Sequence, residues 1–253
     1  MHKLSPKVPI PEVLRNFCRD NPGCRNWDHF YDNHRDSYRE LKRIIFSNQN
    51  YLCAYCEDLV QAEELSTQRI EHFHPKEDTS TDHNWTFDWN NMIGVCMGGS
   101  QDHPTRYLHC DAKKEQTVTP DTCDGFLLNP LDMPTACLFD IDRRDGKLRA
   151  NETACASVNV DCNHFSSVRE LVENTIEVLN LNCDKLNQKR LKVISEYDRL
   201  RKNLRRDAST KSSVRSEIAK RWFSFSHHSF FTTRRILLGT YAEEILTQQG
   251  YNG

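Results

Sequence analysis

Two pairs of cysteines constrain this chain more than any other feature. Cys53 and Cys56 form a C-x-x-C turn, and Cys96 and Cys110 lie downstream. Two thiolates from one such turn can hold a tetrahedral zinc ion, and a second pair completes the four ligands. From residue 51 to about residue 130 the sequence breaks into short runs rich in Cys, His, Asn, Gly, Trp and Pro, which is typical of a small module organised by metal. We therefore predict a structural Zn²⁺ site held by these four cysteines.

The fourth zinc ligand is the least constrained, because thirteen residues separate Cys96 from Cys110. His103, His109 and Cys123 are alternatives to Cys110. A disulfide framework is not expected, since such frameworks are usual in short secreted chains, whereas this chain has 253 residues and no apolar stretch of the signal-peptide kind at its start. No apolar run approaches the roughly 20 residues that span a bilayer. We therefore expect a soluble, cytoplasmic protein that makes no membrane contact.

An acidic residue followed by histidine lies between the two cysteine pairs. Glu71-His72-x-x-Pro75 has the form acid-His-x-x-Pro, and Cys110-Asp111-x-x-Lys114 follows downstream. Four cysteines without this pair would equally suit a zinc knuckle that only binds a partner. The pair favours catalysis, because an imidazole titrates near neutral pH and can take a proton from water. Together the two motifs resemble those of the HNH nucleases.

That resemblance implies a fold and a set of roles. The family's core is a β-hairpin followed by a helix around one catalytic metal, the ββα-metal fold. It implies that Glu71 and Asp111 bind the metal, that His72 is the general base, and that Asn91 braces the loop holding the base. Asn90 is the alternative by one register. Glu71 stands where Asp is usual in the family and Asp111 where His or Asn is usual. Carboxylate ligands favour Mg²⁺ or Mn²⁺ over a soft ion.

Further candidates concern the substrate. His74, Lys76 and Lys114 could contact phosphate, although exposed lysines are more often solvated. From residue 185 to residue 221 there are thirteen Lys or Arg residues, but acids are interleaved with them, and we expect mostly solvated helix faces there. The alternating aromatic residues Trp85, Phe87 and Trp89 are expected in the core rather than on a base-stacking surface. Cys155, Cys162 and His164 match no metal-ligand spacing.

A longer resemblance covers nearly the whole chain. The segments CAYCE, RIEHFHPK, FDWNNM, HCDAKK, LLNP and TIEVLNLN are, in that order, similar to the HNH effector subunit of Septu-type anti-phage systems, a family that includes retron-associated effectors. The resemblance implies a toxic nuclease that works with an ABC-type ATPase, with the retron reverse transcriptase and its msDNA as further candidate partners. DNA is the favoured substrate and transfer RNA the alternative. A non-catalytic zinc-knuckle adaptor that recruits nucleic acid or the ATPase remains the competing hypothesis.

Periodicity predicts an α+β protein in three parts. Residues 1–50 form an N-terminal helical arm that ends in a helix over Asp36 to Ser47, with Leu41, Ile44 and Ile45 facing the core. The resemblance to the HNH nucleases assigns residues 51–130 to the HNH ββα-metal domain. Residues 131–253 contain a β-hairpin around Asp145-Gly146 and then a helical region. The net charge of -2 does not by itself indicate a nucleic-acid binder.

Overall fold

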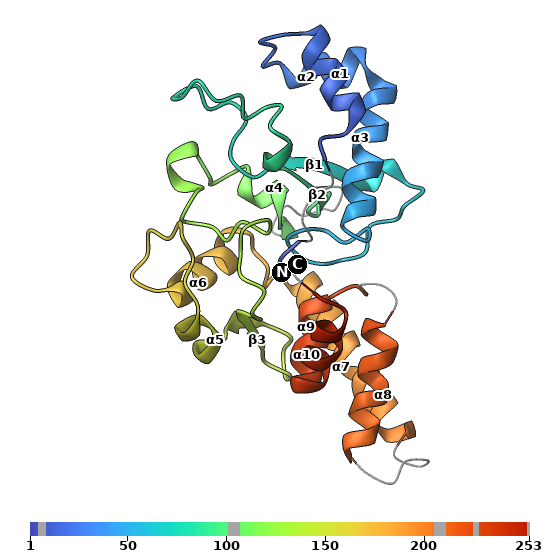
Figure 1. Ribbon diagram of the computed structural model, residues 1–253. Helices are drawn as coiled ribbons and strands as arrows, with labels where there is room; N and C mark the ends of the chain where they lie inside the picture. The colour runs from blue at the N-terminus through green and yellow to red at the C-terminus, as the bar shows by residue number, and fades with distance from the viewer. Residues whose placement is uncertain (5–8, 101–106, 205–210, 225–227, 252–253) are drawn as a thin grey trace.

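The computed structural model describes residues 1–4, 9–100, 107–204, 211–224 and 228–251. It is a mixed α+β structure, mostly helical, with two small sheets of two strands each in the described part of the chain. Figure 1 shows the N-terminal helices at one end, the C-terminal helices at the other, and the first hairpin between them. Among the described residues, no helix is both long enough and apolar enough to cross a membrane.

Three helices form the N-terminal part: α1 (Glu12–Asp20), α2 (Trp27–Asn33) and α3 (Arg35–Asn48). Helix α3 confirms the helix predicted over residues 36–47, and it buries Leu41 and Ile45 as expected from their spacing. Phe17, Phe30 and Leu41 share one buried cluster with Ile70 and Met92 of the first hairpin. The N-terminal helices therefore pack directly on that hairpin.

The first hairpin pairs β1 (Gln68–His72) with β2 (Met92–Cys96), antiparallel, so that Glu71 lies opposite Ile93 and His72 opposite Met92. The chain between the strands contains the 3-10 turn η2 (Trp89–Asn91), and η1 (Leu65–Thr67) precedes β1. Gly94 in β2 lets helix α3 approach the sheet, because a Cβ there would meet the Phe46 ring at 3.0 Å. After β2 comes α4 (Asp111–Lys114), a single helical turn.

The remaining elements build the second half. The predicted hairpin is confirmed as β3 (Phe139–Ile141) and β4 (Leu148–Ala150), with Gly146 at φ 77° in the turn. The helical region that was predicted after residue 166 is also present. The apolar pattern from Ile236 to Leu246 is divided between two helices, because the chain turns at Gly239 with φ 55°. The other elements are η4 (Pro120–Thr122), α5 (Glu152–Ser157), α6 (Val168–Val178), α7 (Asp184–Leu204), α8 (Lys211–Phe223), α9 (Phe231–Leu238) and α10 (Thr240–Gln248).

Candidate active site and metal centre

The four predicted zinc ligands come together in the structure. The Sγ atoms of Cys53, Cys56, Cys96 and Cys110 all lie within 4.8 Å of one another. Two of the Sγ–Sγ distances, Cys53 to Cys110 and Cys56 to Cys96, are 3.8 Å. Zn–S bonds of about 2.3 Å in a tetrahedron require S–S edges of about 3.8 Å. The donor chemistry and the spacing therefore both fit a zinc ion.

Local backbone geometry explains why these thiols converge. The Cys53 turn follows α3 and is held against the hairpin by the bond from the Ala54 amide to the Gly94 carbonyl, at 2.9 Å. Cys96 ends β2. Cys110 immediately precedes α4 with φ 55°, and its amide donates to the Leu179 carbonyl at 2.9 Å. The zinc centre thus joins α3, the hairpin, α4 and the end of α6.

The competing ligands lie elsewhere where the structure describes them. The His109 Nδ1 is 3.1 Å from the Cys110 Sγ, beside the cluster rather than within it. The Cys123 thiol donates to the Phe73 carbonyl at 2.9 Å. His103 lies outside the described residues. Cys110 is therefore the fourth member of the cluster.

A cleft of about 460 Å³ lies beside the zinc centre and is the candidate active site. Glu71 and His72 reach it from the end of β1, and Asp111 and Lys114 reach it from α4. The predicted acid-histidine pair and the downstream acid are therefore brought together around one hollow. Its other lining residues are Trp27, Asp28, Tyr31, Tyr38, Arg69, Ile70, Pro75, Lys76, Glu77, Glu115 and Val118.

His72 is held in one orientation and one tautomer. Its Nε2 donates to the Thr86 carbonyl at 2.9 Å, so the lone pair of the neutral ring is on Nδ1. The Trp27 ring meets the imidazole edge-on, with the ring centroids 4.6 Å apart. Burial lowers the pKa of His72 to about 4. The imidazole is therefore neutral at pH 7 with an unprotonated Nδ1, and it is a weaker base than the near-neutral histidine expected from the sequence.

The carboxyls of Glu71 and Asp111 sit beside the cations of Lys114 and Arg69. Burial raises the pKa of Glu71 well above its usual range, and the nearby Asp111 adds to this effect. Burial also acts to raise the pKa of Asp111, but hydrogen bonds with Glu71 and Arg69 outweigh it and lower that pKa. The Arg69 Nη1 donates to the Asp111 Oδ2 at 2.6 Å. Glu71 and Asp111 are in hydrogen-bond contact, and two carboxyl groups in such contact favour a shared proton or a shared cation.

Lys114 joins α4 to the catalytic strand. Its Nζ donates to the Glu71 Oε1 at 2.6 Å and to the backbone carbonyls of His72 and Phe73 at 3.1 and 2.7 Å. Burial acts to lower the pKa of Lys114, but Glu71 outweighs it and raises that pKa. The ammonium is buried and its three hydrogens are used. This arrangement favours a positioning role over the phosphate contact considered from the sequence.

Asn91 lies where it can brace the loop after His72. Its Oδ1 accepts the His74 amide hydrogen at 2.7 Å, and its Nδ2 donates to the His74 and Trp85 carbonyls, both at 2.9 Å. Asn90 is exposed, so the geometry favours Asn91 of the two registers.

The other substrate candidates differ in placement. His74 is buried outside the cleft lining; its ring nitrogens lie 2.5 and 2.9 Å from carboxyl oxygens of Asp124 and Asp78, and the ring stacks on Trp85. Lys76 lines the cleft and pairs with Glu77.

The remaining sequence candidates are also placed. Phe87 and Trp89 lie in the core, as expected, whereas Trp85 is half-buried and stacks on His74. Cys155 bonds the Leu138 carbonyl at 3.6 Å, whereas Cys162 and His164 lie close to Gly125, and none of the three belongs to a metal-binding group among the described residues.

Three contacts of the site were not foreseen from the sequence. Arg69 could have been found, because it stands two residues before Glu71 and strand alternation puts both side chains on one face. Trp27 and the Thr86 carbonyl carry no such signal, since they reach His72 through packing of distant segments.

Comparison with known proteins identifies the family of this chain. No protein-family model matches it. It is 32% identical over 246 residues to a protein of Escherichia coli named "Retron Ec83 putative HNH endonuclease", and the match covers 92% of each of the two chains. A match of this extent spans the segments that carry the cysteine cluster and the cleft. The chain therefore belongs to the family of retron-associated HNH endonucleases.

Proposed function

We propose that this chain is a metal-dependent HNH endonuclease of the ββα-metal type that hydrolyses phosphodiester bonds in nucleic acid. The observation that carries the proposal is the cleft in which His72, Glu71 and Asp111 meet beside the cysteine cluster. The name of the Escherichia coli relative supports the same chemistry.

His72 acts as the general base. Its Nδ1 takes a proton from a water molecule, because Nε2 is committed to the Thr86 carbonyl. The hydroxide oxygen forms a bond to phosphorus and the P–O3′ bond breaks, so that the 3′ oxygen leaves with the bonding electrons. The Trp27 edge and the Asn91 bonds limit movement of the ring and its loop. Fixing the base in line with its target lowers the entropic part of the barrier.

Glu71 and Asp111 would hold the catalytic cation. Two carboxylates in one cleft are the ligand type that Mg²⁺ or Mn²⁺ prefers. When bound, the cation supplies positive charge to the phosphate and to the leaving oxygen. Lys114 and Arg69 hold these carboxylates in place from α4 and β1. The four thiolates suit Zn²⁺ rather than the catalytic cation, and their role is to fix α4 relative to the hairpin.

The biological setting is proposed from likeness. The relative's name contains a retron, and the resemblance to Septu-type effectors adds an ABC-type ATPase as the partner. We propose that the chain is the toxic effector of such an anti-phage complex, with the retron reverse transcriptase and its msDNA as further partners. DNA is the favoured substrate and transfer RNA the alternative.

The test is a cleavage assay on both polymers. The purified chain is incubated with plasmid DNA or total transfer RNA, in Mg²⁺ or EDTA, with and without its ATPase. Cleavage in Mg²⁺ that EDTA abolishes supports the proposal and identifies the substrate. Failure to cut either polymer, even with the ATPase present, would favour the zinc-knuckle adaptor.

A further inference from the structure

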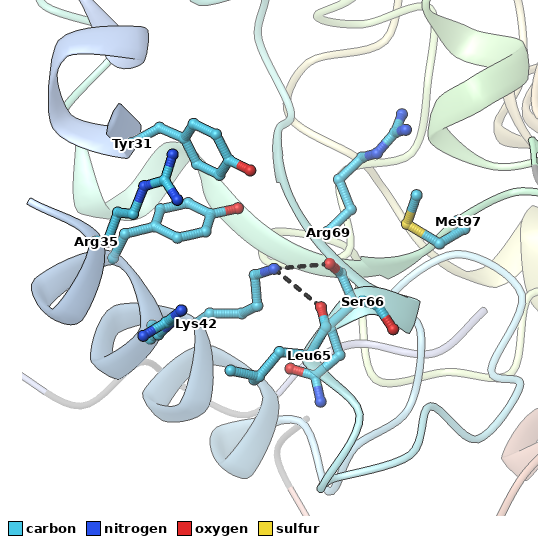
Figure 2. Close-up of a pocket in the computed structure, with 10 residues that line it drawn as sticks. Tyr31, Arg35, Lys42, Leu65, Ser66, Arg69 and Met97 are labelled. Carbon is cyan, nitrogen blue, oxygen red and sulfur yellow. Dashed lines mark hydrogen bonds between the residues drawn. The ribbon is translucent and has the colours of Figure 1, made fainter. Parts of the chain in front are cut away.

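A second hollow, which we call the basic pocket, lies next to the catalytic cleft. It has a volume of about 380 Å³ and is lined by Tyr31, Arg35, Tyr38, Arg39, Lys42, Leu65, Ser66, Gln68, Arg69 and Met97. Tyr31, Tyr38 and Arg69 also line the cleft. Figure 2 shows Tyr31, Arg35 and Lys42 along one side and Arg69 and Met97 along the other. A nucleic-acid strand that leaves the cleft can therefore continue into the basic pocket.

The lining of the basic pocket is cationic. It contains Arg35, Arg39, Lys42 and Arg69, and no Asp or Glu is among its described lining residues. The whole chain has a formal charge of -2, so this positive charge is a local concentration. Such a concentration attracts a polyanion whatever the net charge is.

The arginines at the entrance are available to a ligand. Arg35 has no hydrogen-bond or ion-pair partner among the described residues, and its side chain is exposed. Arg39 pairs with Asp36 at 3.3 Å, but that pair is exposed, with Asp36 98% accessible. An exposed pair of this kind contributes little and is easily exchanged for a phosphate.

Deeper in the pocket, Lys42 is held in place with one hydrogen left over. Its Nζ donates to the Leu65 and Gln68 carbonyls at 3.1 and 2.9 Å, as the dashed lines in Figure 2 mark. It also lies 4.9 Å from the centroid of the Tyr38 ring. An ammonium has three hydrogens, so one remains for an anion in the pocket.

An aromatic surface stands beside these cations. Tyr31 is one of the few exposed large apolar side chains, at 47% accessible. Its ring meets the Tyr38 ring edge-on, with the centroids 4.9 Å apart. Exposed aromatic faces next to cations are how proteins hold single-stranded nucleic acid, by stacking a base and contacting the neighbouring phosphate.

The long basic helices are a weaker candidate for this role. Arg201 and Arg143 both pair with Asp198, and Arg221 pairs with Glu217. Acidic partners therefore offset part of this charge. In the basic pocket Arg39 and Arg69 also have acidic partners, Asp36 and Asp111, whereas Arg35 and Lys42 pair with no acid among the described residues.

We propose that the basic pocket is a substrate-binding subsite, which holds the sugar-phosphate backbone of the cleaved strand next to the scissile bond while a flanking base stacks on Tyr31. The proposal rests on the proposed nuclease function. It assigns Arg35 and Arg39 to phosphate and gives the N-terminal helices a part in substrate binding.

The test measures binding without cleavage. Fluorescein-labelled single-stranded DNA and RNA oligonucleotides of one sequence are titrated with the full-length His72→Ala chain over a range of NaCl concentrations, and anisotropy gives Kd. The test variant adds Arg35→Glu and Arg39→Glu. Glutamate at position 35 lies in the first turn of α3, where an acid suits the helix. The matched control is Arg144→Glu, whose side chain is 90% accessible in the turn of the second hairpin.

For the strand that binds more tightly, the double variant is expected to raise Kd about 10-fold or more. The slope of log K against log salt is expected to fall by roughly 1.4, because about 0.7 ions are released per phosphate contact and two contacts are lost. Tyr31→Ala is expected to weaken binding by about 10-fold with an unchanged salt slope, since it removes stacking. The Arg144→Glu control is expected to stay within about twofold of its parent.

An equal loss of affinity in the double variant and in the Arg144→Glu control would overturn the proposal. So would the absence of measurable binding of either strand to the parent. A kinetic measurement separates this result from failure of the nuclease function. With His72 intact, the double variant is expected to raise KM at unchanged kcat. A parent chain that cuts nothing even with the ATPase present refutes the nuclease function, whereas a parent that cuts with a KM unaffected by Arg35→Glu and Arg39→Glu refutes the subsite alone.

Discussion

The carboxamide of Asn91 bonds both sides of the His74 residue: Oδ1 accepts the His74 amide hydrogen at 2.7 Å, and Nδ2 donates to the His74 carbonyl at 2.9 Å. Asn91→Ala leaves these buried groups without partners and is expected to lower the free energy of unfolding by about 3 kcal/mol. Urea denaturation measures this change. Asn90→Ala, at the exposed neighbouring position, is the control and is expected to change stability by less than about 0.5 kcal/mol. Equal effects of the two substitutions would show that Asn91 does not brace the loop.

Lys114 gives a second prediction. Lys114→Ala removes a buried ammonium that bonds Glu71 and the backbone carbonyls of His72 and Phe73. The free energy of unfolding is expected to fall by about 3–5 kcal/mol, because the partners remain buried. Lys113→Ala is the matched control on the same helical turn, with an expected change below about 0.5 kcal/mol. A small effect of Lys114→Ala would mean that the ammonium is solvated and free to contact substrate.

Zinc content tests the cysteine cluster. The purified chain is expected to contain about one zinc ion, measured by inductively coupled plasma mass spectrometry, and Cys110→Ser is expected to remove most of it. Cys123→Ser is the control, because the Cys123 thiol is buried outside the cluster against the Phe73 carbonyl. If Cys123→Ser lost the zinc and Cys110→Ser kept it, the proposed fourth ligand would be wrong.

The basic pocket predicts a pH dependence. Burial lowers the pKa of Lys42 to about 8, and Arg69 adds to this lowering. The other titratable or charged side chains that line the pocket are Tyr31, Arg35, Tyr38 and Arg39. Below about pH 8 the ammonium is charged and attracts phosphate, and above it the charge is lost, whereas an ordinary lysine would stay charged to about pH 10.

Oligonucleotide affinity is therefore expected to fall between pH 7 and pH 9. Lys42→Arg keeps the charge and is expected to flatten this profile. A profile that is flat for the unsubstituted chain would show that Lys42 does not contact the strand.

Local sequence patterns predicted the parts of the fold that depend on neighbouring residues. Helix α3 followed from apolar spacing, and the β3–β4 hairpin followed from the turn at Asp145-Gly146. The strands of that hairpin have only three residues each. Helices α1 and α2 were expected only as a helical arm, and their joint core with the first hairpin was not foreseen. That core depends on contacts between distant segments.

The candidate site likewise has features that local sequence predicted and features that depend on distant segments. The thiols converge as spacing and motif predicted, because C-x-x-C turns and strand ends are local features. The environment of His72 could not be read from the sequence, since Trp27 lies 45 positions earlier and the Thr86 partner is a backbone carbonyl. The basic pocket was not predicted for the same reason. Arg35 and Arg39 lie on α3, whereas Arg69 lies on β1, so only the fold brings them together.

The rate of cleavage by His72→Ala tests the central claim most directly. The parent, His72→Ala and a control, His83→Ala, whose half-exposed ring pairs with Asp88, are compared in Mg²⁺ with the ATPase present, and urea denaturation checks that each is folded. We expect His72→Ala to cleave about 10²–10⁴-fold more slowly, the usual contribution of a general base, and His83→Ala to cleave at the parent's rate. A folded His72→Ala chain that cuts as fast as its parent would contradict the assignment of His72 as the catalytic base.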